Sequence, residues 1–340
     1  MYIIIKKVGD QLKKSTKRII YSIGFAIFLV SFIGMIYFGY KTFYIEKESD
    51  SAIEYAYHFV LIAEEIDNEY WRLVEQGALK AAAEHEVYLE YLGPPKADNV
   101  QLLKLFDRMI SAQVDGIIIQ GAEGQKFVDL AFKAIERRIP IITVDTDVKS
   151  SLRNAYVGTD NYYAGQLAGK TIIENTIGEQ YVGIVMGRFD SINQQERLAG
   201  FKDAIEATER IQIVGRKQSN ITQIGAAQAT YSLLKEFPSI NTLVGTSALD
   251  GIGMVEGLRE IAPNKDIYIT AFDVLPETLK LIQEGKINTT IAQYPAEMGY
   301  EAIKLMIDFQ QHDVLNKEVF TQTKIVDQND VNRFRTGELK

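Results

Sequence analysis

The stretch "DGIIIQGAEGQKFVDLAFKAIERRIPIITVD" (115–145) contains a complete strand–helix–strand unit. Apolar runs at 115–121 and 139–145 flank a segment whose apolar residues recur at helical spacing. Each run is apolar on consecutive residues, as is typical of strands that are covered on both faces of a parallel sheet. This stretch therefore predicts a βαβ unit with a buried parallel sheet.

The same alternation continues in both directions from about residue 55. Strand-like runs lie at 57–63, 87–93, 115–121, 139–145, 154–160, 180–187, 211–217, 242–247, 266–273 and 288–293. Segments with apolar spacing near 3.6 residues separate most of them, which predicts an α/β fold with parallel sheets. A chain of 340 residues is long enough for about two such domains.

The composition excludes several classes of protein. A net charge of −8 argues against nucleic-acid binding, and the absence of cysteine excludes disulfides and thiolate sites. The three histidines are scattered, and no catalytic or phosphate-binding motif is present. We therefore expect a protein that is not an enzyme and has no metal or cofactor, although Asp145 and Asp273 leave a paired-carboxylate glycosidase open. The glycine-rich "GIGMVEG" (251–257) is interpreted as close helix packing.

The N-terminal region predicts a membrane anchor. Residues 19–40 carry no charge, and 22 helical residues can cross a hydrocarbon layer of about 30 Å. Residues 1–18 hold six Lys or Arg and one acid, so this tail is expected in the cytoplasm and the larger part outside the cell membrane. Residues 41–54 would form a linker. A cleavable signal peptide is the alternative, but no small-x-small cleavage site follows the apolar stretch.

Polar side chains follow several of the predicted strands. They are Asp67, Asn68, Gln120, Asp145, Ser247, Asp273 and Gln293. Because ligands of open α/β sheets bind outside the carboxyl ends of the strands, we expect these side chains to line one cleft. The alternative for each is a helix cap or turn former.

Aromatic residues accompany these polar groups. "EEIDNEYW" (64–71) contains the only tryptophan, and we expect Tyr70 and Trp71 on the short connection between a strand and a helix. Phe272 precedes Asp273 in the same way. Carboxylates, amides, one arginine and rings are the groups that bind a sugar, whose hydroxyls donate and accept while its C–H face is apolar. The set favours a sugar but also suits another small polar ligand.

An ordered series of motifs carries a family resemblance. It comprises "LIAEEIDNEYWRLVEQGALKAA" (61–82), "VDGIIIQGAE" (114–123), "IPIITVDTDV" (139–148), "AYVGTDNYYAGQLAGK" (155–170), "QQERLAGFKDAI" (194–205) and "ITAFDVLPETLKLIQEGKINTTIAQYPAEMG" (269–299). From residue 55 to about 325 the chain resembles the type I periplasmic binding proteins of the ribose-binding-like branch. This resemblance implies two Rossmann-like lobes joined by three crossings, near residues 159, 293 and 322. The lobes would comprise 55–159 with 294–322, and 160–293 with 323–340.

The resemblance also implies a sugar site. The hydrogen-bonding residues would be Asn68, Asp145, Arg197, Asp273 and Gln293, and the ring-packing residues Tyr70, Trp71 and Phe272. Gln120 stands where the family often has asparagine. Ser247, Asn220 and Thr146 depart from the ribose pattern, and the expected second-lobe wall is smaller and differently polar. We therefore expect a pentose such as xylose or arabinose as readily as ribose.

The resemblance leaves two partners open. The family's usual partner is a sugar ABC transporter. A related group with an uncleaved membrane helix senses sugar and activates a membrane histidine kinase of a two-component system. The single helix at 19–40 favours the sensor, because tethering beside a kinase raises its effective concentration. Sugar-responsive repressors share the two-lobe fold, but here the membrane segment takes the place of their DNA-binding motif.

Overall fold

The computed structural model describes residues 2–43, 55–312 and 317–335, and residues 1–54 and 55–340 form two separate compact units. The first unit contains α1 (Tyr2–Phe43), which includes the predicted 19–40 segment and extends well beyond it toward the N-terminus. Its stretch Tyr21–Tyr40 is long and apolar enough to cross a membrane, and none of it is buried within the protein. Residues 44–54 of the expected linker lie outside the described residues.

The second unit contains two six-stranded sheets. The first has the order β11-β5-β4-β3-β1-β2, and all its described pairings are parallel. Its strands are β1 (His58–Ile62), β2 (Tyr88–Leu92), β3 (Gly116–Gln120), β4 (Ile141–Val144), β5 (Ala155–Gly158) and β11 (Lys317–Phe320). We refer to this sheet and its helices as the first lobe.

The sheet of the second lobe has the order β12-β10-β9-β8-β6-β7 and is parallel except for β12. Its strands are β6 (Gln180–Met186), β7 (Ile211–Gln218), β8 (Thr242–Gly245), β9 (Tyr268–Phe272), β10 (Thr289–Ala292) and β12 (Lys324–Asp327). Nine of the ten predicted runs contain one of the strands β1–β10, and β7 extends one residue beyond its run of 211–217. The edge strands β11 and β12 were not predicted, because each has only four residues and mixes charged with apolar side chains.

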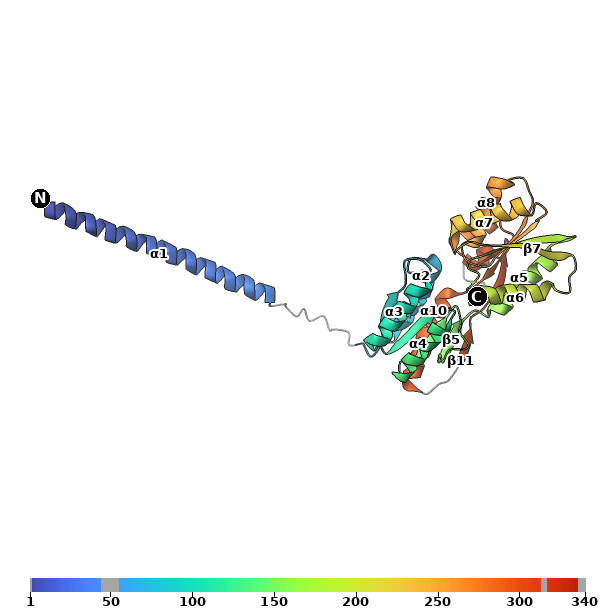
Figure 1. The fold of residues 1–340 in the computed structure, drawn as a ribbon, viewed down its shortest axis with the longest axis horizontal. Helices are drawn as coiled ribbons and strands as arrows, with labels where there is room; N and C mark the ends of the chain where they lie inside the picture. Colours follow the sequence, from blue (N-terminus) through green and yellow to red (C-terminus); the bar gives the residue numbers. More distant parts are fainter. Residues whose placement is uncertain (1, 44–54, 313–316, 336–340) are drawn as a thin grey trace. The chain divides into compact units, whose positions relative to one another are not determined.

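Helices cover both faces of each sheet (Figure 1). In the first lobe they are α2 (Glu69–Glu84) and α10 (Pro295–Gln311) on one face, and α3 (Asn99–Ala112) and α4 (Gln125–Glu136) on the other. In the second lobe they are α5 (Asn161–Asn175) and α6 (Ile192–Ile205) on one face, and α7 (Gln223–Glu236), α8 (Asp250–Ile261) and α9 (Pro276–Gln283) on the other. The short α11 (Val331–Arg335) follows β12.

Strand β1 shows why the predicted runs are apolar on consecutive residues. Phe59 and Leu61 pack in the cluster that contains α2 and α10, whereas Val60 and Ile62 pack in the cluster that contains α3 and α4. Successive side chains of a strand point to opposite faces, so both sets are buried. Two-sided coverage of a parallel sheet is thereby confirmed.

Glycines let the covering helices approach closely. A Cβ atom on Gly253 of α8 would lie 2.4 Å from the carbonyl oxygen of Gln223 on α7, which confirms the packing interpretation of "GIGMVEG". A Cβ atom on Gly165 of α5 would lie 2.0 Å from the carbonyl oxygen of Arg197 on α6. The α5–α6 contact therefore fixes the helix that carries Arg197.

The chain crosses between the lobes three times: after β5, after β10, and between β11 and β12. Thr159 Oγ donates a 2.8 Å hydrogen bond to Gln293 Oε1, and this bond joins the first two crossings. In each sheet the first strand of the lobe, β1 or β6, lies between the second and third. This arrangement creates a switch point, and ligands of open α/β sheets bind at such points outside the carboxyl ends of the strands.

A candidate sugar cleft between the lobes

A cavity with about 400 Å³ of empty space lies between the two lobes. Its lining residues are Glu64, Asn68, Tyr70, Trp71, Asp145, Asn193, Gln194, Arg197, Ile221, Ser247, Ala248, Asp273 and Gln293. Eight of the eleven residues predicted for the site are among them, and the structure brings these eight together from both lobes.

The first wall of the cavity is the start of α2. This helix begins at Glu69, so the expectation that Tyr70 and Trp71 lie on a loop is wrong, and both occupy its first turn. Asn68 is the N-cap residue, and its Oδ1 accepts a 3.0 Å hydrogen bond from the Tyr70 backbone N–H. An N-cap asparagine satisfies a helix donor that would otherwise have no partner, so Asn68 both starts the helix and faces the cavity.

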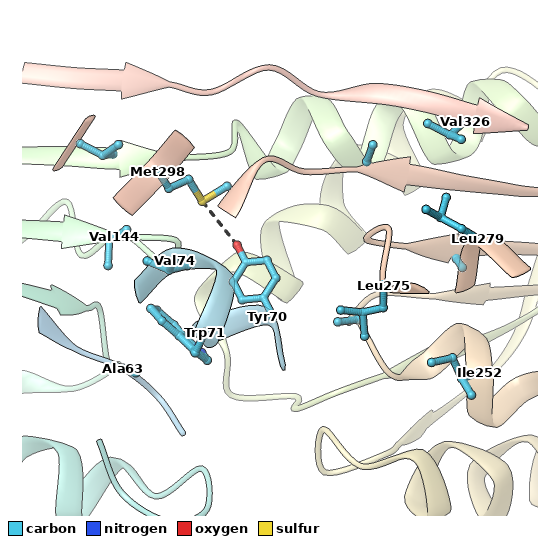
Figure 2. Packing of buried hydrophobic residues seen from close by; sticks show 14 of the residues in the cluster. Ala63, Tyr70, Trp71, Val74, Val144, Ile252, Leu275, Leu279, Met298 and Val326 are labelled. Carbon is cyan, nitrogen blue, oxygen red and sulfur yellow. Dashed lines mark hydrogen bonds between the residues drawn. The ribbon is translucent and has the colours of Figure 1, made fainter. Parts of the chain in front are cut away.

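Tyr70 and Trp71 are buried and also line the cavity. Trp71 is 2 % exposed, and the two rings meet edge to face with centroids 5.9 Å apart. Figure 2 shows the Tyr70 hydroxyl directed at the sulfur of Met298, 3.4 Å away. The same hydroxyl donates a 2.7 Å hydrogen bond to Asp145 Oδ1. The carboxylate is the stronger acceptor, so Tyr70 orients Asp145.

Asp145 follows β4 and has a left-handed backbone with φ of 63°. Its Oδ2 accepts hydrogen bonds of 3.0 Å from Thr146 Oγ and from Asn193 Nδ2. The first donor belongs to the same loop, and the second belongs to α6 of the opposite lobe. Asp145 therefore connects the two lobes directly in this structure.

Arg197 is the cation of the second lobe, and its side chain is 3 % exposed. Its Nε donates to Asn161 Oδ1 at 2.9 Å, and its Nη1 donates to the Thr246 carbonyl at 2.7 Å. Its Nη2 donates to Gln293 Oε1 at 2.8 Å. Arg197 is therefore a buried residue of the cleft and not one half of an exposed helix ion pair with its neighbour Glu196.

Asp273 follows β9 and pairs with the same glutamine. Gln293 Nε2 donates a 2.7 Å hydrogen bond to Asp273 Oδ1. Burial raises the pKa of Asp273 to about 7, although the nearby Arg197 guanidinium and this hydrogen bond lower it. Arg197, Gln293 and Asp273 thus form a connected polar wall beside the second crossing.

Ser247 offers a hydroxyl without a partner. It is 6 % exposed, and among the described residues its Oγ has no hydrogen-bond partner. Leaving a buried hydroxyl unpaired costs about 1–3 kcal/mol. Because Ser247 lines the cavity, a ligand hydroxyl is the group that would satisfy it.

Three predicted residues do not line the main cavity. Phe272 is 1 % exposed and lies under Arg197, whose guanidinium carbon is 4.6 Å from the ring centroid. Gln120 lines a smaller adjacent cavity and donates a 3.3 Å hydrogen bond to Thr146 Oγ. Asn220 is exposed, because two successive left-handed residues place Ile221 at the cavity instead.

Sequence reasoning missed five lining residues: Glu64, Asn193, Gln194, Ile221 and Ala248. Glu64 directly follows the first predicted strand run, 57–63. The strand-end rule that selected Asp145 therefore also selects Glu64. Asn193 and Gln194 precede Arg197 by four and three residues, a spacing that puts them on the same helix face. Ile221 and Ala248 carry no comparable signal, because their neighbours Asn220 and Ser247 are the polar residues.

The cavity combines carboxylates, amides, one guanidinium, a hydroxyl and two aromatic rings in buried surroundings. These groups accept from and donate to hydroxyls and pack on a C–H face, which is the chemistry that recognises a monosaccharide. Within the described ranges, no group of three or more histidine, aspartate or glutamate side chains is placed to hold a metal ion.

Comparisons with known proteins identify the family of the chain. A family model described as a periplasmic binding protein domain matches residues 59–313. The structure of GanP, a glucose-galactose binding protein from Geobacillus stearothermophilus, is 44 % identical, covers 81 % of this chain and 98 % of its own, and superposes with a TM-score of 0.77. A structure described as the XylFII-LytSN complex is 36 % identical over 80 % of this chain and 98 % of that one, with a TM-score of 0.76.

A curated relative extends the match. The D-ribose/D-allose-binding protein of Pseudomonas aeruginosa is 23 % identical over 253 residues, which are 72 % of this chain and 79 % of the relative. The family model covers most of the chain, and the two-lobe fold is the one that the motifs predicted. The chain therefore belongs to the type I periplasmic sugar-binding proteins.

Proposed function

We propose that this protein is a membrane-anchored, extracytoplasmic receptor for a monosaccharide that closes on its ligand and signals to a membrane histidine kinase. The observation that carries the binding part is the cavity between the lobes, whose polar wall includes Asp145 on one lobe and Arg197 and Asp273 on the other. A ligand shifts a conformational equilibrium only by its difference in affinity for the two states. Contacts from both lobes supply that difference in the closed form.

A pentose such as xylose is the first candidate ligand, because Thr146, which donates to Asp145, and Ser247, which lines the cavity, depart from the ribose pattern. A hexose is the second, because the 44 % identical relative is described as a glucose-galactose binding protein. The Asp–Arg–amide set suits either sugar, because both present adjacent hydroxyls.

The signalling part rests on two observations. The apolar segment Tyr21–Tyr40 lies in a helix long enough to hold the domain at a membrane. The 36 % identical relative was solved in complex with a second protein, LytSN. A permanent anchor suits a receptor that stays beside its kinase. Delivery of sugar to an ABC permease is the alternative, because it is the usual role in this family.

Calorimetric titration tests the binding part. Full-length protein in nanodiscs is titrated with xylose, arabinose, ribose, glucose and galactose, with the Asp273→Asn variant as the control. Micromolar or tighter binding of one sugar by the wild type, with at least about tenfold weaker binding by Asp273→Asn, is the expected result. Heat from none of the five sugars would contradict the monosaccharide proposal.

Reconstitution with candidate partners then separates the two roles. Sugar-dependent change in autophosphorylation of a co-reconstituted kinase is expected for the sensor. Sugar-stimulated ATP hydrolysis by a co-reconstituted permease, with no effect on the kinase, would favour the transporter component instead.

A further inference from the structure

Two charged side chains face each other across the cleft, outside the set that the family resemblance supplied. Glu64 lies two residues after the end of β1, and Arg188 lies two residues after the end of β6. These two strands occupy equivalent places in the two sheets. Arg188 Nη1 lies 3.7 Å from Glu64 Oε1, with the two side chains 16 % and 13 % exposed. The same Nη1 donates a 3.4 Å hydrogen bond to Asn99 Oδ1 at the start of α3. One nitrogen of the second lobe thus contacts two residues of the first.

Arg188 is held in this orientation from its own lobe. Its Nε and Nη2 donate to the two carboxylate oxygens of Asp190 at 2.9 and 2.7 Å. Its backbone N–H donates a 3.2 Å hydrogen bond to Oε1 of Gln194, a cavity residue. A bidentate carboxylate fixes the plane of a guanidinium, so little side-chain freedom remains to be lost when the cleft closes.

We infer that Arg188 is a latch that holds the cleft closed by pairing with Glu64 and Asn99 of the opposite lobe, and that the contribution of this latch to closure grows as Glu64 ionises. The latch acts on closure without sugar, so it goes beyond the proposed function. Glu64 also lines the sugar cavity, and the latch therefore lies between the cavity and the smaller cavity that holds Gln120.

The charges around the latch set its response to protons. Burial, together with the charges of Asp145 and Glu65, raises the pKa of Glu64 to about 7. The Arg188 guanidinium and a hydrogen bond with Gln120 act in the opposite direction. Arg188 is surrounded by the carboxylates of Asp190, Glu64 and Asp98. Glu123 lines the same small cavity.

The direction in which closure depends on pH follows from proton linkage. An open cleft exposes Glu64 to water, where its pKa is the ordinary 4.5, so the closed form binds the proton more tightly. Closure is therefore favoured at low pH, and this preference is lost as the pH rises through about 7. The closed-to-open ratio should fall by at least about tenfold between pH 5.5 and 8.5. Arg188 counteracts this loss above pH 7, because it stabilises the ionised Glu64 in the closed cleft.

The absence of cysteine permits a direct measurement. Cysteines introduced at Lys104 on α3 and Ile224 on α7, both exposed and on different lobes, take spin labels at two unique positions. Pulsed EPR on the full-length protein in nanodiscs without sugar then gives the closed and open fractions from pH 5.5 to 8.5. The variants are Glu64→Gln, Arg188→Gln and Arg188→Lys. Arg259→Gln is the control, because it makes the same charge change at an exposed position of the same lobe.

We expect a smaller fall of the closed fraction with pH in Glu64→Gln than in the wild type. In Arg188→Gln we expect a closed-to-open ratio at least about fivefold lower than wild type at pH 8.5, with a much smaller difference at pH 5.5. Arg188→Lys should recover part of the ratio, and Arg259→Gln should match the wild type. Melting curves confirm that each variant is folded.

Three results would overturn the latch: a wild type that is open at every pH, an unchanged slope in Glu64→Gln, or Arg188→Gln that matches Arg259→Gln at pH 8.5. A second arm adds 10 mM xylose or 10 mM glucose at each pH. Failure of both sugars to close the cleft would count against the proposed ligands and leave the sugar-free result intact.

Discussion

Asp145 and Asp273 occupy equivalent places in the two lobes and share a rare backbone conformation. Each follows the fourth strand of its lobe, β4 or β9, and their φ angles are 63° and 68°. Left-handed non-glycine residues persist where the surrounding structure enforces them, and they cluster at ligand-binding sites. The two lobes thus present the same device, a carboxylate on a left-handed residue, to opposite sides of one cavity.

Replacement of Asp273 tests this device. Asparagine tolerates the left-handed region and keeps an acceptor for Gln293, but it removes the charge beside Arg197. We expect Asp273→Asn to bind sugar at least about tenfold more weakly while its melting temperature stays close to that of the wild type. Asp273→Ala should abolish binding, with an added backbone cost of about 1–3 kcal/mol. Unchanged affinity in Asp273→Asn would remove this carboxylate from the site.

Replacement of Ser247 should weaken sugar binding and leave the stability of the sugar-free protein nearly unchanged. Its Oγ has no hydrogen-bond partner among the described residues, and a nearby acceptor is the Asp250 carboxylate, whose pKa it lowers, so Ser247→Ala should remove little from the sugar-free protein. We expect the free energy of unfolding without sugar to change by less than about 1 kcal/mol, and the sugar Kd to rise about five- to tenfold. Chemical denaturation and calorimetry measure the two quantities. A loss of stability with unchanged Kd would assign the hydroxyl to the fold instead.

Trp71 has both roles, because it is 2 % exposed and also lines the cavity. Trp71→Ala should lower the free energy of unfolding by about 3–5 kcal/mol and weaken sugar binding at least tenfold. Trp71→Phe keeps a ring at the site and is expected to recover most of the binding at a smaller cost in stability. If Trp71→Phe binds as weakly as Trp71→Ala while it melts near the wild type, the indole N–H matters more than ring packing.

The stability of the sugar-free protein should depend on pH through Asp273. Its pKa is raised to about 7 in the folded protein, so the folded state binds a proton that the unfolded chain releases near pH 4. The stability linked to this group is present at low pH and lost as the pH rises through 7. We expect the free energy of unfolding to fall by about 2 kcal/mol or more between pH 5 and 8. Asp273→Asn should reduce the fall, and the double variant with Glu64→Gln should reduce it further.

The sequence predicted those parts of the molecule that depend on local pattern. The ten predicted runs became β1–β10, and the pattern is clearest in central strands such as β3 and β4, because burial on both faces leaves them mostly apolar. Asp145 and Asp273 were found because polar residues at strand ends are visible in the sequence. The start of α2 was placed too late, because the N-cap role of Asn68 competed with its interpretation as a loop residue.

Contacts across the cleft could not be predicted in the same way. Phe272 lies under Arg197 instead of facing the cavity, and this depends on how α6 packs on β9. Ile221 and not the predicted Asn220 lines the cavity, because both residues have a left-handed backbone. The sequence pattern does not predict this conformation. Arg188 reaches Glu64 only because the two sheets meet at their switch points, and no periodicity within either lobe contains that information.

The anchor gives the last prediction. The apolar side chains of Tyr21–Tyr40 are exposed in α1, and exposed apolar surface of that length is stable in a bilayer but not in water. We expect the full-length protein to sediment with membranes at its unprocessed mass of 38.3 kDa and to resist extraction by carbonate. A variant with two arginines in place of Phe28 and Ile33 should lose membrane insertion, because each charge costs about 2.5–3.5 kcal/mol at the centre of a span. A shortened soluble form of the wild type would identify the segment as a signal peptide, and the permanent tether that favours a kinase partner would then be absent.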